Sequence, residues 1–508
     1  MQVRARMYRQ GLGDCHLLTF GSGANARHIL IDCGTLGSTT TGVAMSDVAD
    51  DIAATTGGAL DLLVVTHEHQ DHVSGFRSEK ETFADIDVER VWMAWTEDSS
   101  DSTAKGLKKY KGDLVKAARL AAAALEGAGG EAGDERDDRE ALAAGIRRVL
   151  DFVGNEDDAR GKLGEAALGA FAKTVNEAMT WCMRKGNQRT EFLRPGGKAL
   201  EPDWLPGVRI YVLGPPRDPK KIGNMGEHGD PELYELAARQ AGDLATSLGF
   251  FGADEPFDAF FAKAGPEERA ELSRVIPFDA RYRIETRHPQ VRRDFADYYS
   301  RENAWRRIDN DWLAGASDLA LQLDNRINNT SLALAFEIIA DGRVLLFPAD
   351  AQLGNWLSWH DPGMVWKVKK AGGGTQEVRA PDLLRRTVLY KVGHHASHNA
   401  TLEAHGLELM GHEELMAFIP VDRSVATNKE WDMPARPLFR RLIEKTSGRV
   451  VRSDTGWPAR RDPDFGSLFP PADWTRFESA QGKAEKKRKN KARVTIGELH
   501  VDWELETT

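Results

Sequence analysis

The sequence predicts an α/β fold, in which a core of strands and helices is interrupted by two long helical segments. Short apolar runs bounded by turn residues, such as residues 62–65, 344–347 and 388–392, are typical of buried strands. Residues 437–445 instead place their apolar side chains at helical spacing. Residues 98–204 and 217–320 are more highly charged, follow a helical pattern and separate the strand-rich parts.

Length and composition limit the class of protein. The 508 residues allow up to three domains, or one large core with long insertions. The 68 Lys and Arg residues against 78 Asp and Glu give a formal net charge of −10, and 41% of the residues are hydrophobic. These values exclude collagen-like, coiled-coil and wholly disordered chains, and the negative charge disfavours diffuse attraction to nucleic acid.

Cysteine usage and hydropathy indicate the compartment. Cys15, Cys33 and Cys182 are too few and too scattered for a disulfide framework, which favours a reducing environment. The first twenty residues lack the apolar centre of a signal peptide. The most apolar stretch, residues 332–340, contains Glu337 and is far shorter than the roughly 20 residues that cross a bilayer. We therefore expect a cytoplasmic protein with no membrane span.

The predicted elements follow in chain order. Strands are expected at residues 3–7, 15–20, 28–32, 62–65, 209–213, 331–339, 344–347, 388–392, 415–419 and 494–505, and helices at 43–54, 105–125, 140–153, 163–183 and 437–445. We predict one domain over residues 1–475, with a core of about 1–97, 205–216 and 321–475 and helical insertions at about 98–204 and 217–320. Residues 476–508 are predicted to form a basic loop and a last strand.

The strongest functional signal directly follows the predicted strand at residues 62–65. His67, His69, Asp71 and His72 place four candidate metal ligands within six residues. Imidazole nitrogens and carboxylate oxygens suit borderline divalent ions such as zinc or manganese. On one helix, His67 and His69 would point apart, whereas a loop at a strand end can fold the side chains around two adjacent ions.

A two-metal site also needs a bridging carboxylate and further ligands from elsewhere in the chain. Asp350 follows the apolar strand at 344–347, and the doublet His394–His395 follows the strand at 388–392. Taken alone, Asp350 would more often cap a turn, and one of two adjacent histidines is usually structural. All three motifs, however, place their candidate ligands at strand ends.

These motifs resemble the metallo-β-lactamase fold. The pattern His67-x-His69-x-Asp71-His72, followed by Asp350 and His394, is similar to that family, and the resemblance implies a four-layer αββα sandwich with a dinuclear metal site between two sheets. The motifs at residues 10–15, 30–34, 328–332, 347–350 and 391–397, with the segments 431–434 and 452–456, occur in the order seen in the soluble hydrolase domain of competence-associated DNA-uptake channel proteins. The similarity covers about 1–97, 205–216 and 321–460.

The chain also departs from that subfamily. Ala396 stands where the subfamily usually has glycine, and the chain carries no channel domain, so the channel function does not carry over. We find no clear histidine for the family's third motif between His72 and Asp350. His228 could serve, although a surface-loop histidine is the commoner interpretation of His228.

The resemblance implies hydrolysis by a metal-bound hydroxide. We expect two divalent metal ions, zinc in the first place and manganese as the alternative, held by His67, His69, Asp71, His72, Asp350 and His394. Asp71 would orient the hydroxide, and His395 would donate a hydrogen bond to a developing oxyanion or a leaving group. The sequence does not decide which histidine of the doublet is the ligand.

The substrate class leaves three hypotheses open. Our first hypothesis is a phosphodiester in DNA, RNA or a nucleotide, since the subfamily suggests it and the basic run at residues 483–493 would follow a phosphate backbone if it folds beside the site. A hydrolase of a small ester, thioester, amide or phosphorylated head group is the second. A non-catalytic metal-binding module that recruits a protein partner through its helical insertions is the third.

Overall fold

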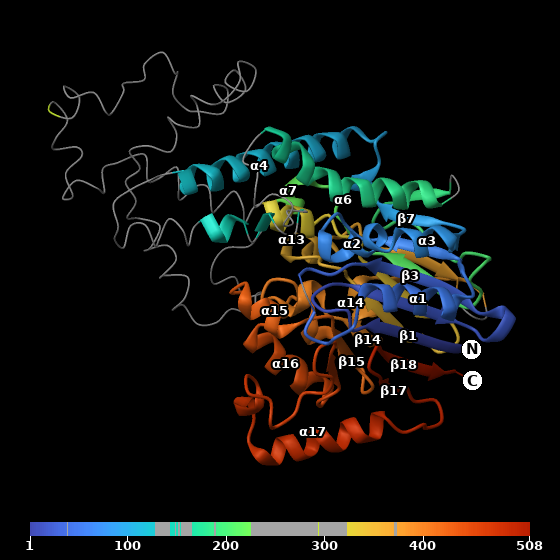
Figure 1. Ribbon diagram of the computed structural model, residues 1–508. Helices are drawn as coiled ribbons and strands as arrows, with labels where there is room; N and C mark the ends of the chain where they lie inside the picture. The colour runs from blue at the N-terminus through green and yellow to red at the C-terminus, as the bar shows by residue number, and fades with distance from the viewer. Residues whose placement is uncertain are drawn as a thin grey trace. The chain divides into compact units, whose positions relative to one another are not determined.

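The structure is a computed structural model that describes residues 1–37, 39–127, 143–147, 149–150, 153, 165–186, 189–224, 293, 323–369 and 373–507 (Figure 1). The chain forms two compact units. The first comprises Met1–Lys109, Asp151–Leu236 and Asp324–Thr508, and the second comprises Tyr110–Leu150 and Ala237–Leu323. All described strands belong to the first unit, which is therefore the part of the chain that builds the candidate site.

Two large sheets dominate the first unit. The first has the strand order β17-β18-β1-β2-β3-β5-β7-β8. Its strands are β1 (Gln2–Tyr8), β2 (Cys15–Phe20), β3 (Arg27–Cys33), β5 (Leu62–Val65), β7 (Val91–Ala94), β8 (Thr190–Leu193), β17 (Arg493–Ile496) and β18 (His500–Glu506). Pairing is parallel from β3 to β8 and antiparallel from β17 to β3.

The second sheet has the order β16-β15-β14-β11-β10-β9. Its strands are β9 (Val208–Val212), β10 (Leu334–Ile338), β11 (Val344–Phe347), β14 (Thr387–Lys391), β15 (Met416–Ile419) and β16 (Val450–Arg452). The strands from β11 to β16 pair in parallel, and β10 pairs antiparallel with both β9 and β11. Two small ribbons, β4 (Ala59–Leu60) with β6 (Asp87–Val88) and β12 (Trp366–Lys369) with β13 (Thr375–Val378), lie outside these sheets.

The two sheets pack face to face, and the alternation of side chains along each strand explains why. In β5, Leu62 and Val64 join residues of the second sheet in one apolar core, whereas Leu63 and Val65 face a separate core. In β11, Leu345 enters the shared core while its neighbours face the opposite side. Because successive side chains of a strand point to opposite faces, a fully apolar strand buries both faces.

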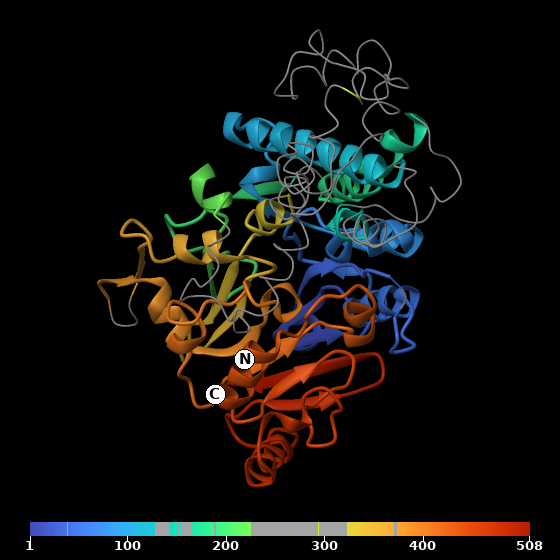
Figure 2. The same ribbon diagram turned by 90° about the vertical axis from the view of Figure 1, so that its left-hand side faces the viewer.

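Helices cover the outer faces of both sheets (Figures 1 and 2). The outer core of the first sheet includes residues from α1 (Met45–Thr56), α2 (Gln70–Ser78), α3 (Lys80–Asp85) and α6 (Glu165–Lys185). The outer core of the second includes residues from α13 (Leu353–Ser358), α14 (Ala380–Arg385), α16 (Arg436–Thr446) and α17 (Pro471–Ala484). The first unit is therefore a mixed α/β structure with layers in the order helix, sheet, sheet, helix.

Helix α16 shows how the sequence specifies one of these layers. Pro437 lies in its first turn, where the missing backbone N–H costs nothing, and Leu438, Phe439, Leu442 and Ile443 form one buried face. The helix ends at Ser447, whose φ of 54° is left-handed.

Most predicted elements are confirmed, including the strands at residues 62–65, 344–347 and 388–392, the helix at 437–445 and the coarse α/β class. Two predictions need correction. The segment 98–204 contains helices α4 (Ser102–Gly127) and α6 as expected, but it also supplies β8, the edge strand of the first sheet. The last strand predicted at 494–505 is a hairpin of β17 and β18, and β18 pairs with β1, so the tail belongs to the core sheet.

Several predictions lie outside the described residues, namely most of the insertion at 217–320, the helix at 140–153 in large part, and His228. The described start of that insertion includes the short helix α7 (Pro219–Ile222). Among the residues that the structure describes, no helix combines the length and apolar character needed to cross a bilayer.

Candidate metal centre

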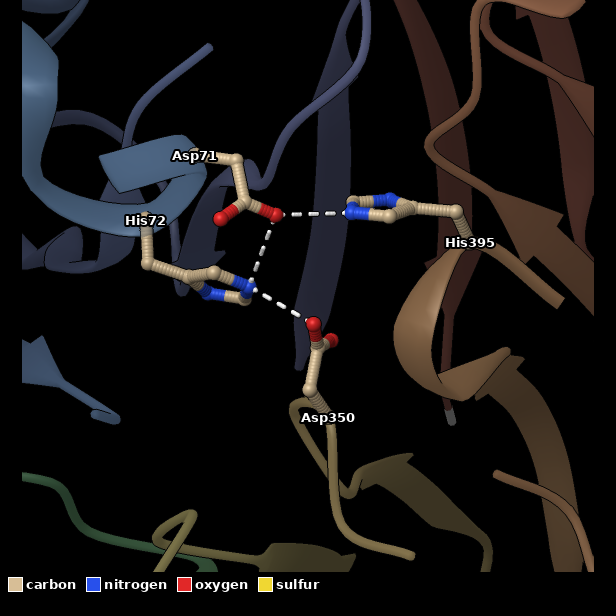
Figure 3. Close-up of side chains that lie close together, drawn as sticks. All are labelled: Asp71, His72, Asp350 and His395. Carbon is tan, nitrogen blue, oxygen red and sulfur yellow. Dashed lines mark hydrogen bonds and ion pairs between the residues drawn. The ribbon is translucent and has the colours of Figure 1, made fainter. Parts of the chain in front are cut away.

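The predicted ligands gather where strands of both sheets end. Thr66 to His69 follow β5, and Asp71 and His72 lie in the first turn of α2. Asp350 follows β11, and His394 and His395 follow β14. Because parallel strands finish at the same edge of a sheet, segments far apart in the sequence meet here (Figure 3).

Asp71, His72, Asp350 and His395 form the centre of this cluster (Figure 3). Each of the four offers one ligand atom, and these atoms all lie within 4.8 Å of one another. His72 Nε2 is 3.1 Å from Asp350 Oδ2 and 3.5 Å from Asp71 Oδ2, and His395 Nε2 is 2.7 Å from Asp71 Oδ2. All four side chains are buried, so two acids and two imidazoles face one point out of contact with water.

His67 and His69 form a second pair beside these four residues. His67 Nε2 lies 3.1 Å from His69 Nδ1, and the rings of His67 and His72 are 4.1 Å apart between centroids. Each neutral imidazole has one nitrogen with a lone pair, so the two rings together can offer a divalent ion two ligand atoms. The loop geometry therefore turns His67 and His69 toward one another, as the sequence analysis anticipated for residues outside a helix.

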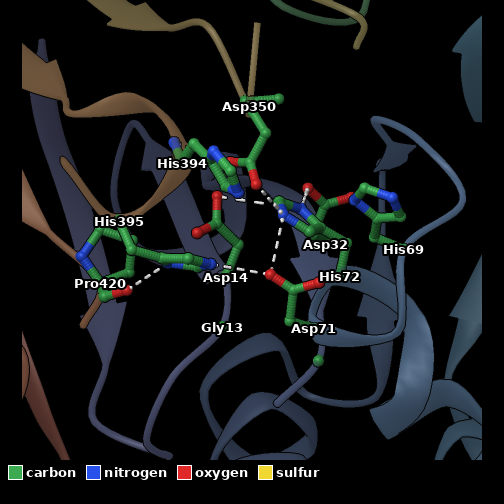
Figure 4. A network of polar contacts seen from close by, with 12 residues as sticks. Gly13, Asp14, Asp32, His69, Asp71, His72, Asp350, His394, His395 and Pro420 are labelled. Atoms are coloured by element: carbon green, nitrogen blue, oxygen red, sulfur yellow. Dashed lines mark hydrogen bonds and ion pairs between the residues drawn. The ribbon is translucent and has the colours of Figure 1, made fainter. Parts of the chain in front are cut away.

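Hydrogen bonds on the far side of two imidazoles fix their orientation (Figure 4). His72 Nδ1 donates to Asp32 Oδ2 at 2.8 Å, and His395 Nδ1 donates to the carbonyl of Pro420 at 2.6 Å. With the proton held at Nδ1, each ring presents Nε2 to the cluster, which is the usual arrangement for metal-binding histidines. Asp32 is itself fixed by the amide and hydroxyl of Thr66, at 2.8 and 2.6 Å.

Lys391 is a buried cation that the sequence analysis did not single out. Its Nζ lies 2.5 Å from Asp14 Oδ2 and 3.0 Å from Asp350 Oδ1, and it donates to the carbonyl of Ala349 at 2.9 Å. The backbone amide of His394 donates to the same Asp350 oxygen at 3.0 Å. Asp350 Oδ1 is thereby held in place, and Oδ2 faces His72.

The charges of the cluster shift the pKa values of its members in opposite directions. Burial alone would lower the pKa of His72, but the carboxylates of Asp350, Asp71, Asp14 and Asp32 raise it well above its ordinary value. Burial would raise the pKa of Asp350, whereas Lys391 and His72 hold it well below the usual range. The raised pKa of the buried His72 imidazole indicates a strongly negative electrostatic potential in the cluster. The same potential attracts a metal cation.

The donor set fits a divalent ion. In the described part of the chain, the buried Asp71 Oδ1 accepts no hydrogen bond, although buried carboxylate oxygens are normally satisfied. Asp350 Oδ2 faces His72 Nε2 at 3.1 Å. Burial, together with the neighbouring His72 and His69, holds the pKa of His67 well below its ordinary value, so that imidazole is in the neutral form that binds metals. Buried acids and imidazoles with unused acceptor atoms are what a zinc or manganese site requires.

Glycines bring the loops of the site into close contact. A Cβ on Gly34 would lie 2.4 Å from the carbonyl carbon of Asp71, and one on Gly13 would lie 2.7 Å from the Asp71 oxygen. The Asp14 amide donates to that oxygen at 2.9 Å. The glycines of the motifs at residues 10–15 and 30–34 therefore allow the backbone to pack against the first turn of α2.

The loop after β14 has a strained backbone. His394, His395 and Ala396 have φ values of 42°, 51° and 66°, in the left-handed region that residues with a Cβ seldom occupy. Asp32 and Ala349, also beside the cluster, have φ values of 56° and 54°. Such strain is typical of functional loops, where the surrounding structure holds the backbone in place. Ala396 occupies a position whose conformation favours glycine.

The structure separates the two histidines of the doublet, between which the sequence analysis did not decide. His395 lies in the cluster that could hold a metal, whereas His394 lies beside it, with Nδ1 3.0 Å from Ser397 Oγ and 3.3 Å from Gln352 Nε2. Burial lowers the pKa of His394 to about 3, so its ring is neutral. Adjacent residues point in different directions, and only the backbone conformation decides which one enters the cluster.

Two residues of the site were missed as functional candidates. The sequence analysis placed Lys391 in a strand and in the motif at residues 391–397 and gave it no role. A lysine that ends an apolar strand near a histidine doublet is unusual, and this signal indicates a buried partner. Ser331 Oγ accepts from the Asp350 amide at 3.2 Å and lies 3.3 Å from His67 Nδ1, which links two of the ligand-bearing segments. Its position in the motif at residues 328–332 was the available signal.

Comparison of the chain with models of known protein families and with curated proteins finds no match. The fold and the site therefore define the class by themselves. The chain is a mixed α/β protein with buried groups of aspartates and histidines that could hold a metal ion.

Proposed function

We propose that the chain is a metal-dependent hydrolase of the metallo-β-lactamase fold, with two divalent ions, zinc or manganese, as cofactor. The observation that carries the proposal is the convergence of Asp71, His72, Asp350 and His395 from three separate segments. The order helix, sheet, sheet, helix and the position of the cluster at strand ends of both sheets support the same fold.

The assignment of ligands follows the two groups of side chains. His67 and His69 would hold one ion, and Asp71, His72 and His395 the other, with Asp350 as the shared carboxylate. Ions held in this way supply Lewis acidity, which polarises an ester and lowers the pKa of water toward neutrality.

The protein's own groups perform the remaining tasks. Lys391 and the His394 amide hold one oxygen of Asp350, so its other oxygen keeps a fixed direction. His394 Nδ1 lies 3.3 Å from Gln352 Nε2, an amide nitrogen that can only donate, which favours the proton of the ring on Nε2. We assign to His394 the hydrogen bond to a developing oxyanion or leaving group that the sequence analysis gave to His395.

A phosphodiester is the proposed substrate class, and the resemblance to the hydrolase domain of DNA-uptake proteins supports it. The basic run at residues 483–493 gives no support, because it lies at the other end of the first sheet. Its Lys491 pairs with Glu413 and Glu414, which precede β15, whereas the cluster lies where the parallel strands end.

Cys15, Cys33 and Cys182 are buried free thiols, in keeping with the cytoplasmic location that we propose.

The test combines metal analysis with hydrolysis assays. Purified protein loaded with zinc or manganese should cleave bis-(p-nitrophenyl) phosphate, and Asp350→Asn should lower the rate by about 100-fold or more. Asp341→Asn is the matched control, because Asp341 is an exposed acid near the start of β11 and its loss should leave the rate unchanged.

Three outcomes would contradict the proposal. Equal rates of hydrolysis in Asp350→Asn and the wild type would show that the metal cluster takes no part in the reaction. Cleavage of p-nitrophenyl acetate but not of the phosphodiester would favour a hydrolase of small esters. Bound metal with no turnover of either reporter would favour a non-catalytic module, with protein partners recruited through the helical insertions.

A further inference from the structure

A cavity of about 950 Å³ opens at the end of the first sheet that lies away from the metal cluster. It is bordered by the start of β1, the end of β2, the start of β3, the end of β18 and the loop that leads into β17. Its volume lies within the range of sites for small organic ligands. Met1 and Thr507 are hydrogen-bonded to one another, so both ends of the chain help to form this part of the molecule (Figure 1).

The strand directions separate this cavity from the metal cluster. His28 near the start of β3 lines the cavity, whereas Asp32 near the end of β3 contacts His72. In β2, which runs antiparallel, Thr19 lines the cavity and Cys15 follows the Asp14 of the cluster. A strand rises about 3.3 Å per residue, so the ends of β3 are roughly 15–20 Å apart.

The lining of the cavity is positively charged although the chain is acidic overall. Six cationic residues border it against two acids, Glu504 and Glu506, while the whole chain has a net charge of −10. The six cations are Arg4, Lys487, Arg488, Lys489, Lys491 and Arg493. Most of them come from the basic run to which the proposed hydrolase activity gives no role.

Contacts with other segments hold the basic loop in place. Some of its charged side chains take no part in these contacts and can bind a ligand. Lys491 pairs with Glu413 and Glu414 at 2.6 and 2.9 Å, and Arg343 donates to the carbonyl of Asn490 at 2.9 Å. In the described part of the chain, Arg488 and Lys489 take part in no ion pair and are exposed. An anchored loop presents these side chains at lower entropic cost than a disordered tail would.

We propose that this cavity binds an anion that carries several phosphate groups. Phosphate oxygens match a concave surface with an excess of lysine and arginine, and such a ligand gains from every cation that it contacts. A nucleoside triphosphate and a nucleic-acid strand share this chemistry. The cavity is a second site, independent of the metal cluster and of the hydrolysis proposed there.

The experiment measures binding of ATP and of a short oligothymidylate by isothermal titration calorimetry, with a chelator present to remove metal ions. The double variant R488E/K489E reverses two exposed charges of the cavity. The double variant K80E/K105E is the matched control, because Lys80 and Lys105 are exposed elsewhere and the net charge changes equally. We expect affinity to fall about tenfold or more in R488E/K489E, to stay near the wild-type value in the control, and to weaken with salt.

The two probes distinguish the sources of the phosphate groups: tighter binding of ATP identifies a nucleotide site, and tighter binding of oligothymidylate identifies a strand site. Equal losses in both double variants would overturn the proposal, because net charge alone would then explain binding. Unchanged affinity in R488E/K489E, or no binding of either probe to the wild type, would also overturn it. Asp350→Asn should bind both probes as the wild type does, so this test does not depend on the hydrolase proposal.

Discussion

The two ends of the first sheet differ in charge and in burial. Where β3 and β5 finish, acids and histidines are packed out of contact with water, and Asp71 and His72 have no exposed surface. Where β3 begins, Arg488 and Lys489 lie at the surface around an open cavity. The same strands thus connect a buried, negative cluster to an exposed, positive one.

This difference shows how burial decides what a charge requires. A buried carboxylate loses its hydration and needs a partner in the protein or a bound cation, whereas an exposed lysine keeps its water and needs none. At the buried end, Lys391 and two imidazoles partly neutralise Asp14, Asp71 and Asp350. Substitutions at the buried end should therefore have larger effects on stability than substitutions at the exposed end.

The largest effect is expected for Lys391→Met. The change leaves Asp14 and Asp350 without their shared cation in a buried site, and removal of one partner of a buried ion pair costs about 3–5 kcal/mol of unfolding free energy. Denaturant unfolding of metal-free protein measures it. Lys367→Met, on an exposed position of β12, is the control and should change the unfolding free energy little. A loss as small as that of the control would mean that the two carboxylates are not charged together.

The next effect separates the two histidines of the doublet. His395→Gln should lower metal affinity by about 100-fold or more, because His395 Nε2 belongs to the cluster. His394→Gln should leave metal affinity unchanged and lower the rate constant of hydrolysis, because His394 lies beside the cluster. Metal titration and steady-state kinetics on the two variants measure this. The reverse pattern would identify His394, not His395, as the metal ligand.

A smaller effect is expected from pH in the absence of metal. The folded protein raises the pKa of His72 through its carboxylate neighbours, so this group contributes stability that is fully present below its unfolded pKa of about 6.5 and is lost as the pH rises through the folded pKa. Chelated protein should therefore melt at lower temperature as the pH rises above neutrality. Metal-loaded protein should not, because cations replace the proton. Parallel melting curves with and without metal would contradict the prediction.

The smallest effect is expected for Ala396→Gly. A left-handed φ of 66° costs alanine about 1–2 kcal/mol, and the greater chain entropy of glycine offsets part of that gain, so the variant should be about 0.5 kcal/mol more stable. Ala49→Gly is the control, since Ala49 is also buried but lies inside helix α1, and it should be destabilised by about 0.5–1 kcal/mol. Denaturant midpoints of the two variants should move in opposite directions.

The sequence predicted the strands that carry the site. These strands bury both faces, so each is a continuous run of apolar residues that is easily recognised, as at residues 62–65 and 344–347. It also predicted that His67, Asp71 and Asp350 would meet, since each follows such a strand and strand ends share an edge. The edge strand β8 was missed because its sequence, Thr-Glu-Phe-Leu, is short, half-exposed and preceded by a long helix.

The remaining features depend on contacts between distant segments. The sequence could not separate His394 from His395, since their directions follow from positive φ values that the packing of the loop imposes. The role of Lys391 depends on its contact with Asp14, which directly precedes β2 of the other sheet. The place of the basic run became clear only when β18 paired with β1 and fixed the tail at the far end of the sheet.

The local sequence thus determined which residue types could bind a metal and which strands carry them, because hydrophobic alternation and residue type act over a few neighbouring positions. Which histidine enters the cluster, which cation supports Asp350 and where the positive charge gathers were decided by tertiary structure alone. Two of the contacts involved, His395 with Asp71 and Lys391 with Asp14, join side chains more than three hundred residues apart, and a local pattern contains no information on such contacts.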